Sequence, residues 1–314
     1  MPRLIFVIPS KQDVYMKSVG IFGYPISHSI SPIFQQAAFD YLGIDAIYKP
    51  WCVEPGSLEK RIAQLRDKNS LGCNITIPHK VVAKQYVDKL DPLAEKIGSI
   101  NTIVNRDEEL IGYNTDIGGF IRSLGAYGKF DPSGKHVLVI GAGGAARAAV
   151  YGLESKGASS IHIVNRTIAK AKAIADEFPE DHVVAESYEN INHLISRNDF
   201  SLIVNCSSMG MKDGVAEFLS PLHFKEVSED VFIYDMVYTP QITPFLRSAK
   251  KNGNRYLGGL SMLVMQGAES FELWTGKPAP IDVMFSASEL SLILISEPTR
   301  RYAISYAVFC LKKK

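Results

Sequence analysis

A glycine-rich segment in the middle of the chain has the spacing that binds the phosphates of a dinucleotide. An apolar run leads directly into the sequence GAGGAARA, which places Gly141, Gly143 and Ala146 in a G-x-G-x-x-A pattern. The first glycine allows a tight turn, the second leaves room for a pyrophosphate, and the small third residue lets helix and strand approach each other. A chance glycine cluster would form only a turn, but here a predicted strand precedes the motif and a predicted helix follows it. We therefore predict a dinucleotide site at Gly141, Ala142, Gly143, Gly144, Ala145 and Ala146.

The residues that follow the next predicted strand favour NADP over NAD. An enzyme that binds NAD usually presents an acidic side chain there to the ribose hydroxyls. This chain has Asn165, Arg166 and Thr167 instead. The guanidinium of Arg166 could bind a 2′-phosphate, with the two neutral side chains as further donors. A surface arginine at the start of a helix would have the same spacing, so the cofactor preference is a prediction to be tested.

The elements that must position these residues alternate between strand and helix. Helical segments at 144–156 and 167–178 connect runs typical of buried strands, at 137–140, 161–164, 183–185, 202–204 and 231–234. Parallel neighbours need crossover helices, so the alternation predicts a doubly wound parallel sheet covered on both faces. A long apolar helix after 258–259 runs to Trp274 and does not continue the alternation, which suggests that it returns to the first part of the chain.

The first part of the chain has its own α/β pattern. A helix from Pro32 to Leu42 is followed by strand-like runs at 46–53 and 72–77 and by a hairpin over 101–113. We therefore predict an α/β protein with a first unit at 1–117, a dinucleotide-binding unit at 118–257 and C-terminal helices at 258–314 that pack on the first unit. Residues 1–15 precede a second methionine, and they are either a dispensable extension or an ordinary first strand.

Composition excludes several function classes. The 314 residues are 46% hydrophobic, which provides enough apolar material for two cores, and the net charge is only +1. Such a balance offers no field to attract nucleic acid or a membrane surface, so neither is expected as a partner. No apolar run reaches the roughly 18 to 20 residues of a spanning helix. The four cysteines form no C-x-x-C pair, which fits free thiols in a reducing cytoplasm.

Four polar clusters in the first unit lie beside turns or strand ends, where side chains point into clefts. They read GYPISHSISP, GCNITIPHK, GSINTI and GYNTDIGG. Two later segments follow the glycine motif, first YDMVYTPQITPFL and then GGLSMLVMQGAESFELWTG. Together these segments resemble the shikimate dehydrogenase family over residues 19–284. The resemblance implies an N-terminal α/β substrate domain, a Rossmann domain for NADP, and shikimate or 3-dehydroshikimate as the small-molecule substrate.

The resemblance also implies roles for individual residues. Lys80 and Asp116 match the catalytic pair, and Ser29 and Ser31 match serines that hold the substrate carboxylate. Thr76, Asn101 and Gln266 match positions that bind substrate hydroxyls. Met236 and Gly259 match positions beside the nicotinamide, and Tyr238 matches a residue at the domain cleft. Gln35 and Ser261 depart from the usual His and Gly, which predicts a modest change in substrate fit. The tail from 285 to 314 follows no family pattern, and its default interpretation is an amphipathic surface helix.

The predicted pair suits the oxidation of a secondary alcohol. Such a reaction removes a hydride from carbon and a proton from the hydroxyl, so a proton-transfer group must reach that oxygen. In the reverse direction the ammonium of Lys80 would donate to the developing alkoxide and stabilise its charge. Asp116 would orient Lys80 and bind a hydroxyl. Taken singly, each residue is better explained without catalysis, as a surface lysine and as an Asp116 that caps the helix after it.

Three further points remain open from the sequence. Quinate, which differs from shikimate near the carboxylate-binding serines, could also be a substrate, so a dual quinate/shikimate dehydrogenase is an alternative. A dinucleotide-binding regulator without turnover is a less favoured alternative. Assembly as a homodimer is compatible with the resemblance. No metal site is expected, because His28 and His79 have no partners at metal-ligand spacing, and solvent-facing or hydrogen-bonded roles suit them better.

Overall fold

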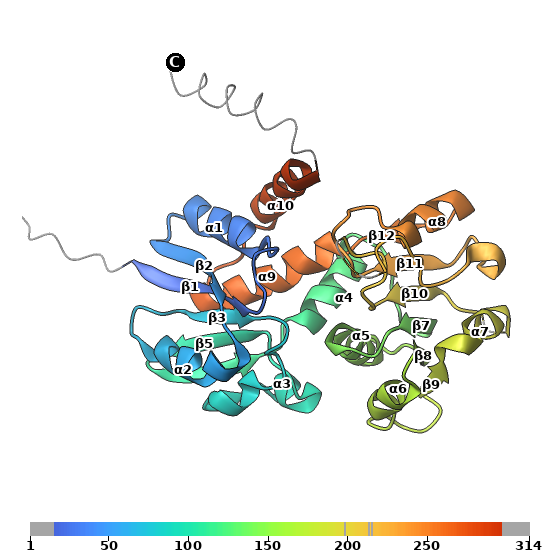
Figure 1. Ribbon diagram of the computed structural model, residues 1–314, viewed down its shortest axis with the longest axis horizontal. Helices are drawn as coiled ribbons and strands as arrows, with labels where there is room; N and C mark the ends of the chain where they lie inside the picture. The colour runs from blue at the N-terminus through green and yellow to red at the C-terminus, as the bar shows by residue number, and fades with distance from the viewer. Residues whose placement is uncertain (1–15, 198, 213, 215, 297–314) are drawn as a thin grey trace, which may run out of the picture.

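The protein consists of two halves, each built on a six-stranded sheet (Figure 1). The computed structural model describes residues 16–197, 199–212, 214 and 216–296. The two interpretations of residues 1–15 and the prediction for the end of the tail, 297–314, lie outside these residues. Among the described residues, none of the helices combines the length and the apolar character that a membrane crossing needs.

The first sheet mixes parallel and antiparallel strands in the order β2-β1-β3-β5-β6-β4. Strand β1 pairs in parallel with β2 and β3, whereas β3, β5 and β6 pair antiparallel. Arg106 stands opposite Glu109, so the predicted hairpin is confirmed. The strands are β1 (Lys17–Gly23), β2 (Ala46–Cys52), β3 (Gly72–Ile75), β4 (Lys89–Leu90), β5 (Thr102–Arg106) and β6 (Glu109–Tyr113), and the helices are α1 (Ser31–Tyr41), α2 (Leu58–Ala63) and α3 (Pro92–Ile97).

The second sheet is entirely parallel, in the order β12-β11-β10-β7-β8-β9. Apolar clusters cover both of its faces, which confirms the doubly wound prediction. The strand order reverses between β7 and β10, and ligands of such sheets bind outside the carboxyl ends at this point. The strands are β7 (His136–Ile140), β8 (Ser160–Asn165), β9 (Val183–Ser187), β10 (Leu202–Asn205), β11 (Phe232–Asp235) and β12 (Tyr256–Leu257), and the helices are α5 (Gly144–Ser155), α6 (Ile168–Ala175), α7 (Ile191–Arg197) and α8 (Pro244–Asn252).

Two long helices join the halves. Helix α4 (Asp116–Ala126) and helix α9 (Leu260–Thr275) lie side by side at the centre of the molecule (Figure 1). Met262 at the start of α9 belongs to the core of the second half, whereas Phe271 and Trp274 near its end pack in the core of the first. The approach of the two helices is so close that a Cβ on Gly119 would lie 2.5 Å from the Cβ of Gln266.

The C-terminal helices return to the first half, as predicted. Helix α10 (Ile281–Ser296) packs against α1, where Met284 and Leu292 are buried, while Leu290 faces solvent. The described part of the tail is thus a helix, but the expected amphipathic pattern is wrong for it, because Ser288 and Ser291 are buried while Leu290 and Ile293 are exposed. The domain boundaries at 117/118 and 257/258 stay predictions.

Candidate active site

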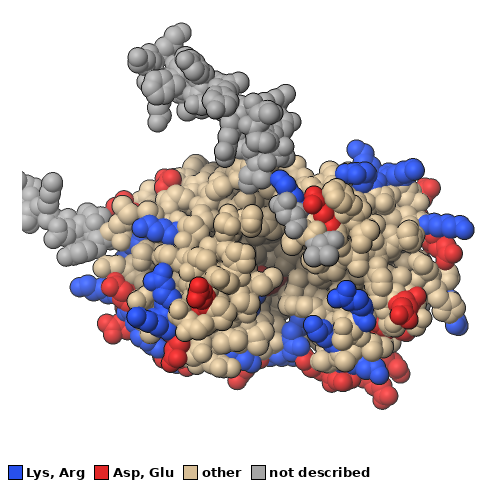
Figure 2. Space-filling model, viewed as in Figure 1, with Lys and Arg blue, Asp and Glu red and all other residues tan. Residues whose placement is uncertain are grey.

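A cavity of about 410 Å³ opens between the two halves. Figure 2 shows the hollow between them. Its walls come from the loops after β1, β3, β10 and β11 and from the facing ends of α4 and α9. The predicted site residues that line the cavity are Ser29, Ser31, Thr76, Lys80, Asn101, Asp116, Ala145, Met236, Tyr238, Gly259 and Gln266.

Lys80 and Asp116 form an ion pair within this cavity. The Lys80 Nζ donates to Asp116 Oδ2 at 2.5 Å, and the exposed fractions of the two side chains are 27% and 10%. Lys80 lies on the loop after β3, and Asp116 is the first residue of α4. The helix cap is Thr115. The alternative of Asp116 as a helix cap is therefore wrong, because its carboxylate binds an amine from a distant loop.

Asn101 holds the carboxylate of Asp116 in place. Its amide donates to Asp116 Oδ1 at 2.9 Å and to Thr115 Oγ1 at 2.9 Å, and its oxygen accepts from the Thr115 backbone N–H at 2.7 Å. The amide also reaches Gln266 Oε1 on α9 at 3.2 Å. Asn101 is 2% exposed. The ion pair is thus oriented from behind by a buried network, as a proton-transfer group requires.

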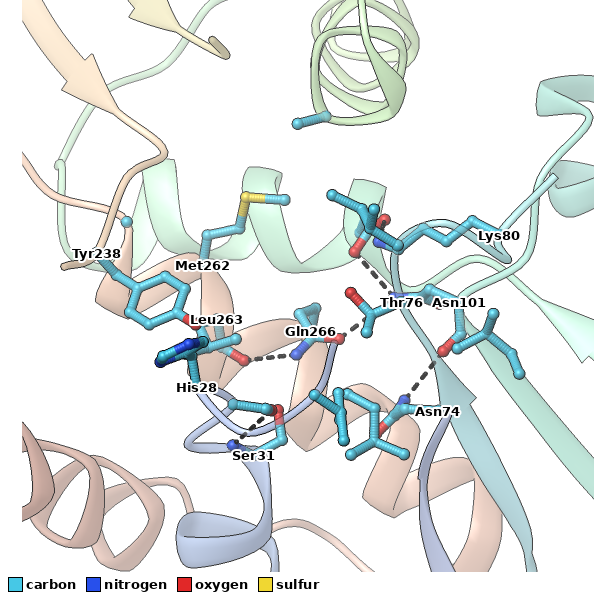
Figure 3. Close-up of a pocket in the computed structure, with 18 of the residues that line it drawn as sticks. His28, Ser31, Asn74, Thr76, Lys80, Asn101, Tyr238, Met262, Leu263 and Gln266 are labelled. Carbon is cyan, nitrogen blue, oxygen red and sulfur yellow. Dashed lines mark hydrogen bonds and ion pairs between the residues drawn. The ribbon is translucent and has the colours of Figure 1, made fainter. Parts of the chain in front are cut away.

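The other polar groups face the cavity from both halves and from α9. Figure 3 shows Lys80 and Asn101 on one side and Tyr238 and His28 on the other, with Thr76 and Gln266 between them. Ser29 and Ser31 lie at the start of α1, where Ser29 Oγ accepts from the Ser31 N–H at 3.3 Å. A helix start with two hydroxyls is suited to a carboxylate. The cavity can therefore hold a small acid with several hydroxyl groups.

The glycine motif lies beside the cavity, at the switch point of the second sheet. Gly141 has φ +111°, and a Cβ there would lie 3.1 Å from the backbone of Cys206 and Ser207. No atom lies within 4 Å of a Cβ placed on Gly143 or Gly144, so the start of α5 is open to a ligand. Ala146 is fully buried against the sheet. These features fit a dinucleotide pyrophosphate at the start of α5, with Ala142 completing the turn.

Arg166 directly follows the carboxyl end of β8, the strand that pairs with β7. Asn165 ends β8, and its side-chain amide donates to the Thr167 carbonyl at 2.8 Å. Arg166 and Thr167 are exposed, and within the described ranges no hydrogen bond or ion pair occupies the Arg166 guanidinium. Arg147, by contrast, is paired with Glu177 at 2.6 Å. Arg166 is therefore free to bind an external phosphate.

Comparisons with known proteins agree with this geometry. Three family models match: the shikimate dehydrogenase substrate binding domain over residues 21–103, shikimate / quinate 5-dehydrogenase over 126–220, and the shikimate 5'-dehydrogenase C-terminal domain over 259–284. Shikimate dehydrogenase (NADP(+)) of Desulforamulus reducens is 40% identical over 84% of this chain and 92% of its own length. The chain belongs to the shikimate dehydrogenase family.

Solved structures of this family have the same fold. Shikimate 5-dehydrogenase from Thermus thermophilus, in complex with NADP(H) and shikimate, is 34% identical with a TM-score of 0.78, over 87% of this chain and 99% of that one. The ligand-free 5-ketofructose reductase of a Gluconobacter species is 30% identical with a TM-score of 0.77, over 87% and 98%. The second similarity means that the fold alone does not select the substrate.

Two departures from the shikimate dehydrogenase pattern do not lie in the cavity wall. Gln35 is fully buried, and its amide donates to the Gly267 carbonyl at 2.8 Å, which ties α1 to α9. Ser261 Oγ pairs with Ser123 Oγ at 2.6 Å and ties α9 to α4. Neither residue lines the cavity, so the modest change in substrate fit that the sequence predicts would have to act through the packing of these helices, and it stays a prediction.

Several wall residues were missed by the sequence analysis. Asn74 is buried and donates to Asn101 O, Thr102 Oγ1 and Ser270 Oγ, and a polar residue inside an apolar strand could have signalled this role. His28 is exposed and lines the cavity, whereas His79 is buried and hydrogen-bonded to Val53 O. The other missed wall residues are mostly apolar, and no sequence pattern distinguishes them from core residues: Ile21, Tyr24, Pro25, Ile26, Ile75, Ile77, Met211, Met262 and Leu263.

Gly259 provides a test of the packing that shapes the cavity. A Cβ there would lie 2.1 Å from the Met236 carbonyl oxygen and 2.5 Å from its carbon, both backbone atoms. Gly259→Ala is therefore expected to lower the free energy of unfolding by about 1 to 3 kcal/mol, because the loop or the start of α9 must move. Urea denaturation measures the change. Gly125→Ala, in open space on α4, is the control and should leave stability unchanged or slightly higher. Equal stability of both variants would contradict the packing argument.

Proposed function

We propose that the protein is an NADP-dependent oxidoreductase that interconverts shikimate and 3-dehydroshikimate, a step of chorismate and aromatic amino acid biosynthesis. The observation that carries the proposal is the oriented Lys80–Asp116 ion pair inside a cavity that also borders an open glycine motif. The family membership and the NADP-dependent relatives support the same reaction.

The roles of the site residues follow from their places. NADP, when bound at the glycine motif and Arg166, supplies the acceptor or donor of the hydride. During reduction the ammonium of Lys80 donates its proton to the developing alkoxide oxygen, and during oxidation the neutral amine of Lys80 takes the proton from the reacting hydroxyl. Asp116 keeps the amine of Lys80 aimed at that oxygen, and Asn101 keeps Asp116 aimed at the amine. Met236 and Gly259 are proposed to lie beside the nicotinamide, and Tyr238 at the cleft between the domains.

The substrate end of the cavity suits a cyclic hydroxy acid. Ser29 and Ser31 are proposed to bind the carboxylate, and Thr76, Asn101 and Gln266 the ring hydroxyls. Quinate is the second candidate substrate, because one matching family model covers shikimate and quinate dehydrogenases together. A site that hydrogen-bonds a particular hydroxyl can discriminate against an analogue lacking it by roughly 10⁴ to 10⁵.

Absorbance of NADPH at neutral pH tests the proposal directly. We expect rapid loss of absorbance with 3-dehydroshikimate and gain with NADP⁺ and shikimate, and a much smaller kcat/KM with quinate. Comparable kcat/KM values for both acids would identify a dual enzyme instead. Binding of NADPH without turnover of either acid would contradict the proposal and favour a regulator.

Location, assembly and domain limits complete the proposal. We propose that the protein works in the cytoplasm, since Cys52, Cys73 and Cys206 are free thiols, as is usual in a reducing compartment. The substrate domain is proposed to comprise 1–117 with the helices of 258–314, and the NADP domain 118–257. A homodimer is proposed as the assembly, and light scattering of the purified chain tests it.

A further inference from the structure

A buried carboxylate lies next to the cavity without a role in the proposed reaction. Asp235 ends β11, directly before the wall residue Met236, and it is 0% exposed. The side-chain amide of Asn205 donates to Asp235 Oδ1 at 2.9 Å, and the Val237 backbone N–H donates to the same oxygen at 3.0 Å. The hydroxyl of Thr243 donates to Oδ2 at 2.5 Å. Both oxygens are thus held by neutral donors.

These bonds tie together the two loops that form the nicotinamide side of the cavity. Asn205 also accepts from the backbone N–H and the hydroxyl of Ser207, at 3.0 and 2.6 Å, at the start of the loop that carries Met211. The Met236 N–H donates to the Asn205 carbonyl at 2.9 Å. The carboxylate therefore fixes the loop after β10 and the loop after β11 relative to each other.

No cation compensates the charge of this carboxylate in the described part of the chain. None of the ion pairs found there involves Asp235. Burial raises the pKa of Asp235 to about 6, against the lowering by its hydrogen bonds, so the group is ionised at pH 8. A buried charge without a partner is costly and is retained where it has a use. Here the neighbouring cavity receives a ring that is positively charged in NADP⁺ and neutral in NADPH.

We propose that Asp235 is a positioning residue for the nicotinamide. Asp235 holds the wall residues Met211, Met236 and Tyr238 in place, and its negative charge favours binding of the oxidised ring over the reduced ring. The inference rests on the proposed NADP site. Asp235 does not itself line the cavity, so its charge acts over a distance through the protein. At an effective dielectric constant of about 20, opposite charges about 10 Å apart attract strongly enough to change an affinity by about 3- to 30-fold. Asp235 itself touches neither the substrate nor Lys80.

The ratio of the dissociation constants of NADP⁺ and NADPH tests this charge. NADPH fluorescence gives one constant and competition by NADP⁺ gives the other, without any substrate. We expect Asp235→Asn, which keeps the shape of the side chain, to weaken NADP⁺ relative to NADPH by about 3- to 30-fold at pH 8. Asp230→Asn is the matched control, because it removes the same charge from an exposed residue that precedes the same strand.

The pH dependence of the same ratio gives a second test that needs no variant. Because the carboxylate becomes neutral as the pH falls through about 6, the preference for NADP⁺ should be present at pH 8 and decrease towards pH 5.5. Titration of the 2′-phosphate cancels in the ratio. Burial raises the pKa of the two nearby groups, Cys206 and Tyr234, so both stay neutral over this range. Tyr256 of β12 and the exposed Arg247 of α8 form no ion pair or hydrogen bond with the carboxylate among the described residues.

The outcomes separate this inference from the proposed function. A ratio that falls with pH in the natural protein and is flat in Asp235→Asn supports the inference. A ratio that is independent of pH in the natural protein, or unchanged by Asp235→Asn, overturns it even if the enzyme is active. Failure to bind either form of the dinucleotide would overturn the cofactor assignment and the inference together. If Asp235→Asn does not fold, the pH profile decides when it persists in His28→Gln and in Glu269→Gln, which remove the imidazole in the cavity wall and the carboxyl near Asp116 whose pKa burial raises to about 7.

Discussion

Replacement of Lys80 by alanine is expected to lower kcat by about 10²- to 10⁴-fold with little change in NADP affinity. The amine of Lys80 is the cavity group that can move the hydroxyl proton, and it is held by Asp116 at 2.5 Å. The glycine motif lies on other elements and is untouched by the substitution. Steady-state kinetics with shikimate and fluorescence titration of NADPH measure the two quantities separately.

A neighbouring lysine provides the control. Lys84 lies four residues after Lys80 in the sequence but does not line the cavity, so the Lys84→Ala variant should retain nearly all of the natural protein's turnover. A kcat within a few-fold of the natural protein for Lys80→Ala would exclude Lys80 as the proton-transfer group. Asp116→Asn, which keeps the bond to Asn101, should lose less than Lys80→Ala because the amine remains in the cavity.

Replacement of Arg166 by alanine is expected to weaken NADP binding by about 10- to 100-fold, since hydrogen bonds to a charged group contribute about 1.5 to 3 kcal/mol. NAD has no 2′-phosphate, so its affinity should stay nearly constant. The guanidinium is exposed and has no partner of its own among the described residues, so the substitution disturbs no internal contact. Binding titrations with both dinucleotides measure the effect.

The control for this prediction is Lys172, an exposed lysine on α6, the helix that follows Arg166. Lys172→Ala removes one positive charge from the same region, so it separates a direct phosphate contact from a general effect of charge. Equal weakening of NADP and NAD by Arg166→Ala would contradict the assignment. If both variants lost the same amount of affinity for NADP, Arg166 would act only through the general positive charge of this region and not through a direct contact with the phosphate.

Much of the second half could be predicted because its signals are local. A strand that runs into closely spaced glycines and then a helix is specified within about a dozen residues, and Gly141 indeed adopts a φ that favours glycine. The alternation of apolar strands and helices determines the parallel sheet in the same way. Short helices such as α7 and α8 escaped the analysis because their patterns are brief.

The polar centre of the cavity depends on contacts between distant positions. Lys80 and Asp116 are 36 residues apart, and Asn101 and Gln266 are 165 residues apart, yet all four side chains meet. Resemblance to a family indicated these residues, but their hydrogen bonds follow from the crossing of α4 and α9. Gln35 and Ser261 illustrate the limit, since the sequence marks them only as departures from the family pattern, and the fold shows that their side chains make hydrogen bonds between helices.

The sequence by itself determined the dinucleotide motif, the cofactor preference it predicts and the alternation of elements, because each depends on backbone conformation and burial over a few neighbouring residues. Only the tertiary structure decided which polar side chains share one cavity, that Asn101 orients Asp116, and that Asp235 is buried next to the wall residue Met236 with no ion-pair partner among the described residues. The physical reason is that charge, burial and hydrogen bonding are properties of a site, and the site exists only where distant segments meet.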